Sequence, residues 1–431
     1  MKTKNVPFGK YQKIAVEICR ILIALVFVFS GFVKAVDPWG SAYKFQDYFA
    51  VWNFTFLDFL ALPASFSLAT LEFTLGVCLL VGIYRKIASR LTFLFMCFMT
   101  PLTLYLAIFN PVTDCGCFGD ALVITNWQTF YKNIVLIIAA FIVVLRHKQI
   151  TCLYSRKYRS RVLTVTLVFI LGISIYCFRY LPILDFRPYK IGNHVPELMQ
   201  IPEGATADVY ETTLIYEKNG VRKNFTVKNY PKEDSGWVFV ETIHKLIKKG
   251  YEPPVHDFSI TTEAGDDITD EVLADDGYTF LLISHRLGKA DDSNVGNINS
   301  VYDYALQNNY RFLCLTASLP REITEWKENS GAEYPFCTMD GITLKTIIRS
   351  NPGLLLIKDG TVVNKWPNRL IPGSDDWQAP LKDSPLGFSP ANQDLRNLLL
   401  LSSALIIPLI IIGLIDRKRK KRRMDKCVAT N

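Results

Sequence analysis

The chain has 431 residues, half of them hydrophobic and 13% aromatic, and its formal net charge is +8 at pH 7. The hydrophobic residues gather in long runs before Leu181 and in one run near the C-terminus, which excludes a wholly soluble protein. The basic residues are concentrated beside those runs, and this placement argues against a nucleic-acid-binding protein.

Six segments are apolar enough to cross a bilayer, whose hydrocarbon core of about 30 Å needs roughly 20 residues of helix. The first segment is too long for the apolar part of a cleavable signal peptide, so we expect it to remain as an anchor. The predicted spans are Ile14–Val33, Phe59–Ile83, Ile87–Phe109, Phe130–Leu145, Val162–Leu181 and Leu398–Ile415.

The distribution of Lys and Arg predicts the orientation, because short loops rich in these residues stay in the cytoplasm. Seven consecutive basic residues, Arg417 to Arg423, follow the last span, and others crowd the loop Arg146–Arg161. We therefore expect a protein of the bacterial inner (plasma) membrane with both termini in the cytoplasm and a tail that contacts anionic lipids. The segments expected outside are Lys34–Asp58, Asn110–Gln128 and Pro182–Asp394.

The first external segment, Lys34–Asp58, is rich in aromatic residues. Such residues are typical of a belt at the level of the lipid headgroups, and a lid over a membrane pocket is the alternative. Inside the spans, Glu17 and Arg20 share one helix face and can pair. Glu72 has no partner in its own span, and Arg20 is a candidate partner across the bundle. A structural ion pair and a proton or quinone pocket remain equally open.

The large external segment contains two patterns of strands. Tyr210–Val227 alternates apolar and polar residues around Asn219-Gly220, which predicts a β-hairpin. From Tyr278 onward strands alternate with helices, which predicts βαβ units closed by a hairpin at Asp359-Gly360. The predicted elements are the strands Tyr278–Ser284, Arg311–Thr316, Leu354–Lys358 and Thr361–Trp366, and the helices Val295–Asn308, Leu319–Asn329 and Ile342–Arg349.

This order over Glu252–Trp366 resembles the thioredoxin-like fold, and Pro254–Phe258 resembles the entry turn of its redoxin branch. The resemblance implies that Pro352, directly before a strand, is the cis-proline that faces the active site. The family's Cys-x-x-Cys would follow the first core strand, where this chain reads Ser284–Lys289 without a cysteine. We therefore expect no dithiol exchange in this domain, since that reaction needs a thiolate there.

Three other residues of this region leave alternatives open. Cys314 and Cys337 are predicted to be buried, inert thiols, and a disulfide between them is the alternative. His285 stands where the catalytic thiol would be, and is either a surface or capping residue or one with a ligand or proton-transfer role.

The motif with the clearest chemistry is Asp114-Cys115-Gly116-Cys117-Phe118-Gly119-Asp120, in the loop between the third and fourth spans. A Cys-x-Cys disulfide closes a small strained ring, and strain makes a disulfide easier to reduce. We favour a redox pair over a structural staple, and both over zinc, which needs more ligands than this loop offers. The charges of Asp114 and Asp120 are expected to oppose thiolate formation.

This motif, with Arg20, the run Phe29–Lys34 and Glu72, resembles the DoxX-like membrane proteins and in particular their MauE branch. The resemblance covers about Ile14–Leu145 and implies a four-span bundle. It also implies disulfide formation or quinone-linked thiol redox outside the cytoplasm. It identifies Cys115 and Cys117 as the reactive pair, and it allows a quinone as cofactor without requiring one.

The fold class expected is therefore a polytopic α-helical membrane protein with an extracytoplasmic α/β thioredoxin-like domain. Two functions compete: an oxidoreductase acting through Cys115 and Cys117, and a non-enzymatic anchor whose inactive thioredoxin-like domain binds an envelope client protein. No metal site and no nucleic-acid partner are predicted. The expected regions are a DoxX/MauE-like bundle (1–150), a cytoplasmic loop with the fifth span (151–181), a β-rich segment (182–251), the thioredoxin-like domain (252–394) and the sixth span with its basic tail (395–431).

Overall fold

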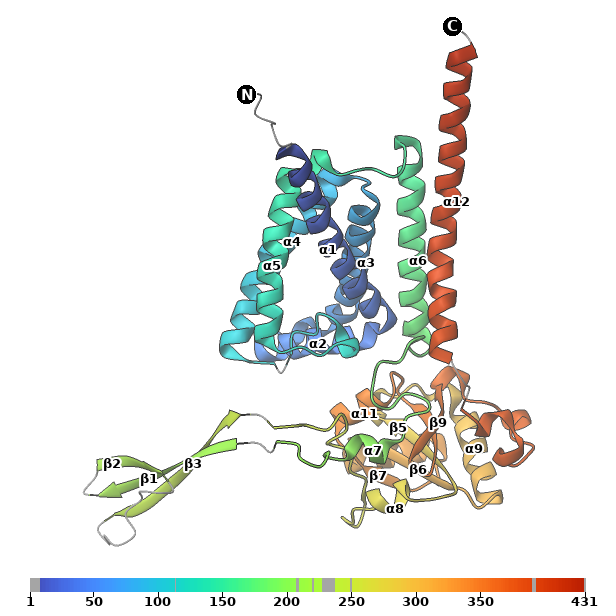
Figure 1. Ribbon diagram of the computed structural model, residues 1–431. Coiled ribbons are helices and arrows are strands. Elements are labelled where there is room, and N and C mark those ends of the chain that lie inside the picture. Colours follow the sequence, from blue (N-terminus) through green and yellow to red (C-terminus); the bar gives the residue numbers. More distant parts are fainter. Residues whose placement is uncertain are drawn as a thin grey trace.

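The computed structural model describes residues 8–112, 114–206, 209–218, 221–226, 237–248, 250–389 and 393–429. Six helices in this part of the chain are long and apolar enough to cross a membrane, and they coincide with the six predicted spans. A bundle of helices stands next to a separate α/β domain (Figure 1). The helices of the membrane part are α1 (Phe8–Val36), α2 (Pro38–Val51), α3 (Asp58–Val81), α4 (Arg85–Phe109), α5 (Asn126–Leu145), α6 (Arg159–Arg179) and α12 (Gln393–Ala429).

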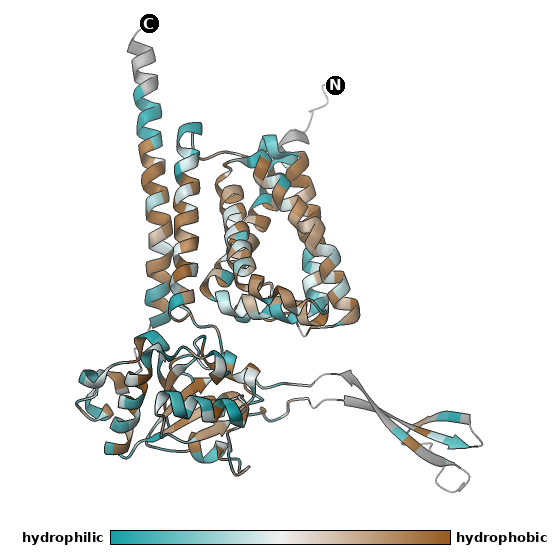
Figure 2. Ribbon diagram, turned by 180° about the vertical axis from the view of Figure 1, so that it is seen from behind, coloured by the Kyte–Doolittle hydropathy of each residue, from teal (hydrophilic) through white to brown (hydrophobic). Residues whose placement is uncertain are grey.

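Helices α1, α3, α4 and α5 form the bundle, and α6 and α12 run side by side next to it (Figure 1). Helices α1 and α3 pack backbone to backbone, because two glycines remove the side chains between them. A Cβ atom on Gly31 would lie 2.4 Å from the Phe73 amide nitrogen, and one on Gly76 would lie 2.7 Å from that of Val28. Apolar residues cover the helices between their polar ends (Figure 2), as a bilayer requires.

The two ends of the bundle differ. The beginning of α1 and the end of α12 lie at one end, and helix α2, the loop between α4 and α5 and the α/β domain lie at the other (Figure 1). Helix α2 runs across the mouth of the bundle rather than along it. The motif Asp114–Asp120 therefore lies between the spans and the α/β domain.

Strands β1 (Val209–Lys218), β2 (Val221–Thr226) and β3 (Val238–Lys248) form a small sheet that projects to one side of the α/β domain (Figure 1). β1 pairs with β2 in antiparallel register up to Lys218 opposite Val221, so the predicted hairpin is confirmed. The turn residues Asn219-Gly220, and Val227, lie outside the described residues.

The α/β domain contains a six-stranded sheet in the order β4-β7-β6-β5-β8-β9. Strands β5, β6 and β7 are parallel, and β8 and β9 continue the sheet in antiparallel register. This order, with helices on both faces, is thioredoxin-like, and the strands and helices predicted from Tyr278 onward are confirmed. The strands are β4 (Thr261–Thr262), β5 (Tyr278–Ser284), β6 (Arg311–Thr316), β7 (Phe336–Thr338), β8 (Gly353–Lys358) and β9 (Thr361–Pro367), and the longer helices are α9 (Val295–Gln307), α10 (Pro320–Ser330) and α11 (Gly341–Ile347).

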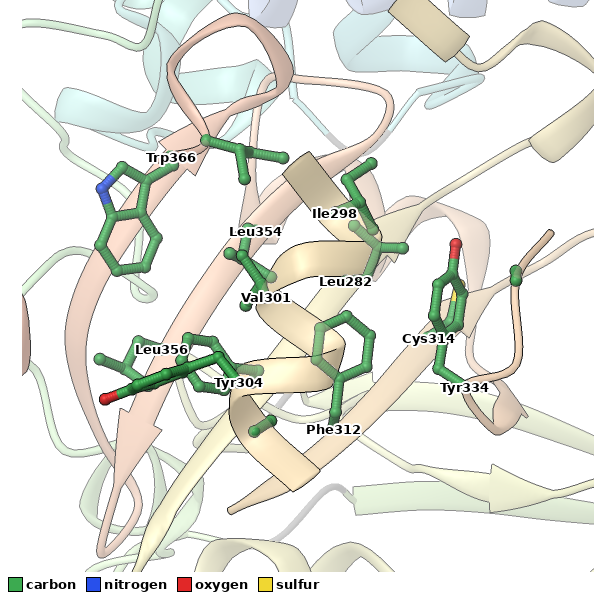
Figure 3. Packing of buried hydrophobic residues seen from close by; sticks show 14 of the residues in the cluster. Leu282, Ile298, Val301, Tyr304, Phe312, Cys314, Tyr334, Leu354, Leu356 and Trp366 are labelled. Atoms are coloured by element: carbon green, nitrogen blue, oxygen red, sulfur yellow. The ribbon is translucent and has the colours of Figure 1, made fainter. Parts of the chain in front are cut away.

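Each face of the sheet has its own hydrophobic core, because successive strand residues point to opposite faces. Figure 3 shows the first core, where Val301 and Tyr304 of α9 pack near Phe312 of the sheet. Cys314 belongs to this core, whereas Cys337 belongs to the core on the other face. The alternative of a Cys314–Cys337 disulfide is therefore wrong. Both are buried free thiols.

Candidate functional site

The two cysteines of the Cys-Gly-Cys motif lie in contact at the mouth of the bundle. Their Sγ atoms are 3.1 Å apart, a hydrogen-bonding distance for two unbonded thiols. Cys115 is buried and Cys117 is half-buried. The loop is held at both ends, because α4 ends at Asn110 in the left-handed conformation and α5 begins with a capping box between Thr125 and Gln128. The thiols are thus held side by side without a covalent bond.

Side chains from α1 and α2 fix the backbone of the motif. The Ser30 hydroxyl and the Lys34 ammonium donate hydrogen bonds to the carbonyl oxygen of Cys117, at 2.7 and 2.8 Å. The Tyr48 hydroxyl donates to the carbonyl oxygen of Cys115 at 2.9 Å. Both cysteines are therefore tethered through their carbonyls, and their thiols stay free to react.

Between the cysteines, Gly116 has a φ of +66°, which only glycine adopts without strain. A Cβ atom there would also lie 3.0 Å from Cγ of Lys44, which passes over the loop. Lys44 in turn forms an ion pair with Asp114 at 2.5 Å. A glycine at this position lets the loop turn tightly below α2.

The charged residues of the spans pair differently from the expectation. Lys34 binds Glu72 at 2.8 Å, and the Ser30 hydroxyl lies 2.7 Å from the same carboxylate, so its single proton is shared between Glu72 and the Cys117 carbonyl oxygen. Arg20 instead pairs with Glu17 and donates to the carbonyl oxygens of Leu79 and Leu80. The proposed Arg20–Glu72 contact is therefore wrong, because Lys34 lies closer along the same span. The predicted Glu17–Arg20 pair is present.

The two thiols differ in acidity. The hydrogen bond between the two thiols lowers the pKa of Cys117 to about 6 despite burial, and the charges of Lys132 and Lys34 act in the same direction. The same hydrogen bond, followed by burial, raises the pKa of Cys115 well above its usual value. The two thiols therefore titrate as a pair, in which Lys132 and Lys34 favour the thiolate on Cys117.

The expectation that Asp114 and Asp120 oppose the thiolate is wrong. Asp114 is neutralised by Lys44, as described above, and Asp120 forms an ion pair with Arg349 at 3.1 Å. The cations nearest to Cys117 come from the spans instead. Lys132 of α5 lies over the Phe118 ring, 4.2 Å from its centroid, and so sits beside the motif.

Arg349 of the α/β domain joins the two parts of the protein. Its guanidinium is buried and donates three hydrogen bonds of 2.7–3.1 Å to Asp37, in addition to the contact with Asp120. Burial alone would raise the pKa of Asp37, but the charge and hydrogen bonds of Arg349 lower it. Gly40 is required beside this cluster, since a Cβ there would meet the Asp37 carboxylate at 2.3 Å. The α/β domain is therefore fastened directly over the Cys-Gly-Cys loop.

The edge of the α/β domain that would carry a Cys-x-x-Cys motif faces α2. The Asn351–Pro352 peptide bond is cis, at the position that the thioredoxin resemblance singled out. The Ser284 hydroxyl donates to the Asn351 side chain at 2.8 Å. His285 is half-buried, with its ring edge-on to Tyr43 of α2 at 6.5 Å between centroids. This edge is therefore covered by the membrane part.

Sequence reasoning missed Arg349 and Asp37, because nothing local connects residues so far apart in the chain. Lys34 could have been found, since it lies four residues after Ser30 and therefore on the same helix face. Lys44 and Tyr48 lie in the aromatic segment Lys34–Asp58, which the sequence explained as a belt at the level of the lipid headgroups. In the described part of the chain, no three His, Cys, Asp or Glu side chains gather as a metal site would require.

Comparisons with known proteins give matches to two parts of the chain. Residues 12–146 match the family model of the methylamine utilisation protein MauE, and residues 210–249 match a domain of unknown function (DUF8463). No curated protein matches the chain. A solved structure from Bacteroides thetaiotaomicron, described as a "putative protein disulfide isomerase", is 17% identical and covers 26% of this chain and 75% of its own. Its TM-score of 0.21 is too low to support an argument, so the thioredoxin-like assignment rests on the strand order.

Proposed function

We propose that this six-span protein, whose N-terminal bundle matches the MauE family, is a thiol–disulfide oxidoreductase of the bacterial inner membrane with Cys115 and Cys117 as its reacting groups. The observation that carries the proposal is the contact between two thiols of unequal acidity. A purely structural pair has no need of a stabilised thiolate, whereas disulfide exchange depends on one.

The reaction begins with Cys115 and Cys117 joined as a disulfide. A client thiolate attacks this bond, and Cys117 leaves as the thiolate because the more acidic thiol is the better leaving group. A second client thiolate then displaces Cys115, which gives a client disulfide and the Cys115/Cys117 dithiol. Since Cys115 is buried beneath α2, this helix must move for a client to reach it.

Closing the dithiol again releases two electrons and two protons, which need an acceptor. A cavity of about 940 Å³ between α1, α12 and the α/β domain is mostly apolar, with Phe29, Phe32 and Leu398 in its wall. Phe29 also contacts the Phe118 ring of the motif, with 5.4 Å between centroids. These features fit a quinone, which when bound would accept both electrons and both protons.

The orientation belongs to the same proposal. The basic segment Arg417–Arg423 at the end of α12 and the Arg146–Arg161 loop are expected in the cytoplasm, because short segments rich in Lys and Arg stay there. Both termini would then lie in the cytoplasm as well. The Cys-Gly-Cys loop and the α/β domain are at the opposite end of the bundle (Figure 1) and so would lie in the oxidising extracytoplasmic space. The DoxX-like resemblance of this bundle supports the same location.

The missing Cys-x-x-Cys favours a second candidate, a membrane anchor whose α/β domain binds an envelope client without reacting. In the oxidoreductase reading, Cys115→Ser and Cys117→Ser abolish client oxidation, and Cys97→Ser, at an exposed position in α4, has no effect. In the anchor reading, both serine variants retain function, and Arg286→Gln on the turn after β5 loses it. The same four variants therefore separate the two functions.

The decisive measurement is the redox state of Cys115 and Cys117 in intact cells. A membrane-impermeant maleimide is applied with and without prior reduction, and mass spectrometry maps the labelled positions. We expect a mixture of oxidised and reduced pairs that shifts towards the dithiol when quinone reoxidation is blocked. A pair that stays oxidised and resists mild reductant contradicts the proposal and leaves a structural staple.

A further inference from the structure

A second cavity, of about 600 Å³, lies between the α/β domain and the membrane part. Its floor is the turn after β5 with His285, beside the cis-proline segment at Asn351. Its opposite wall contains Trp39 and Tyr43 of α2 and the end of α6. The cavity therefore occupies the edge where a thioredoxin-like domain with a Cys-x-x-Cys motif would hold its thiols. It plays no part in the reaction proposed above.

The cavity is strongly basic. Two carboxylates, Asp58 and Asp291, face six cationic side chains, and Asp291 already accepts the backbone N–H of Ser293. The cationic residues are Arg179, Arg286, Lys289, Lys345, Arg349 and Arg369.

The cations of the cavity outnumber the carboxylates near them. Arg349 is bound to Asp37 and Asp120, and Arg286 lies 3.4 Å from Glu322. Arg369 and Lys345 act on Asp291 and Asp47 through their charges, without a direct ion pair. Cations that converge on one space with too few counter-charges repel one another, and a bound anion would relieve that repulsion.

His285 of the cavity wall is affected by burial and by the neighbouring cations. Burial, followed by the charges of Lys345, Lys289 and Arg286, lowers the pKa of His285 to about 4. Its ring is therefore neutral at pH 7 and can donate one hydrogen bond to an anionic oxygen. Lys345 also lies over the Tyr43 ring, 5.0 Å from the centroid, which holds its ammonium at the cavity wall.

We propose that this cavity binds a phosphate group, supplied by the headgroup of an anionic phospholipid or by free phosphate. Guanidinium and ammonium groups are the usual protein ligands of phosphate, and the volume is in the range of small-molecule sites. The lipid source is favoured by position. The wall of the cavity includes Trp39, Phe178 and Tyr180, which lie at or next to the ends of α1 and α6, where lipid headgroups are expected.

The test uses the full-length protein in a non-ionic detergent. Binding of short-chain phosphatidylglycerol, phosphatidylcholine and inorganic phosphate is titrated separately by thermophoresis. The site variant is Lys289→Gln/Arg369→Gln, which removes two exposed cations of the cavity. The control is Lys382→Gln/Arg321→Gln, which makes the same charge change elsewhere on the α/β domain. Melting temperatures without ligand verify that both variants fold.

We expect the site variant to bind phosphatidylglycerol at least about tenfold more weakly, and the control to bind it like the unmodified protein. A loss restricted to phosphatidylglycerol identifies a lipid headgroup as the source. A parallel loss for inorganic phosphate identifies a site that also takes the free anion. Equal binding by both variants, or an equal loss in both, overturns the proposal.

Discussion

The Cys-Gly-Cys loop of the bundle and the Ser284–Lys289 turn of the α/β domain both lie where the two parts of the protein meet. They differ in the chemical groups that they present there. The loop has two thiols, and several of its nearby charges are matched in pairs, such as Lys34 with Glu72 and Lys44 with Asp114. The turn has no thiol and contributes Arg286 and Lys289 to a cavity in which cations outnumber carboxylates. In this chain the paired thiols are located in the membrane loop, while the thioredoxin-like edge is lined by cations.

The comparison also separates the buried cation Arg349 from the half-buried cation Lys132. Arg349 is fully compensated by Asp37 and Asp120 and holds the α/β domain in place. Lys132 is uncompensated among the described ion pairs, and its charge acts on the Cys117 thiol. The first cation should therefore matter for stability and the second for reactivity, which the following variants can test.

The largest expected effect is on stability. Arg349→Met leaves the Asp37 carboxylate buried without its partner, and such a loss costs about 3–5 kcal/mol. We expect a clear drop in the melting temperature of the purified protein in mild detergent. The matched control is Arg369→Met, an exposed position in the same domain, where about 0.5 kcal/mol or less is expected. Equal melting temperatures for the two variants would refute the role of Arg349 as the fastening between the two parts.

Much of the fold could be predicted from the sequence, because its signals are local. Runs of about 20 apolar residues mark all six spans, and the alternation of strands and helices marks the α/β domain. The Asp359-Gly360 turn, with φ of +46° and +62°, has the residues that a tight hairpin needs. These features depend on neighbours in the chain, so periodicity and turn chemistry were sufficient to find them.

The site could be predicted only in part. The Cys115-Gly116-Cys117 motif is visible in the sequence. The charges that act on it come from distant segments: Lys34 and Lys132 act on Cys117, and Arg349 pairs with Asp120. Sequence reasoning assigned the influence on the thiols to Asp114 and Asp120, which are the nearest charges in the chain. In the folded protein each of these aspartates has a cationic partner. Distance along the chain was therefore a poor guide to electrostatics at the thiols.

The second expected effect is on reactivity. Because the thiolate is the reactive form, the rate of alkylation of Cys117 in the reduced protein should rise with pH and reach half of its maximum at about pH 6. Lys132→Met removes a charge that stabilises the thiolate, so the midpoint should move upward. At pH 6 half of Cys117 is thiolate in the unmodified protein, so a rise in the pKa equivalent to about 1–2 kcal/mol should slow labelling by roughly 3- to 15-fold.

The control for this experiment is Lys382→Met, which removes an exposed charge from the α/β domain. Labelling is followed by mass spectrometry of the Cys117 peptide, so that the other cysteines do not contribute to the rate. A midpoint at about pH 8.5, typical of an unperturbed thiol, would contradict the lowered pKa of Cys117. An unchanged midpoint in Lys132→Met would leave the Cys115 hydrogen bond and the charge of Lys34 as the causes of the lowered pKa.

The smallest expected effect tests the tight turn of the loop. Gly116→Ala places a Cβ at a φ of +66° and 3.0 Å from the Lys44 side chain, which can shift because it is flexible. The left-handed conformation costs a non-glycine residue about 1–2 kcal/mol, so we expect a modest fall in melting temperature. Gly172→Ala in α6 is the control, since no atom lies within 4 Å of its Cβ position and alanine favours a helix. If Gly116→Ala melts no lower than Gly172→Ala, the loop does not depend on glycine. The contact between Cys115 and Cys117 would then owe its geometry to the carbonyl tethers from Ser30, Lys34 and Tyr48 alone.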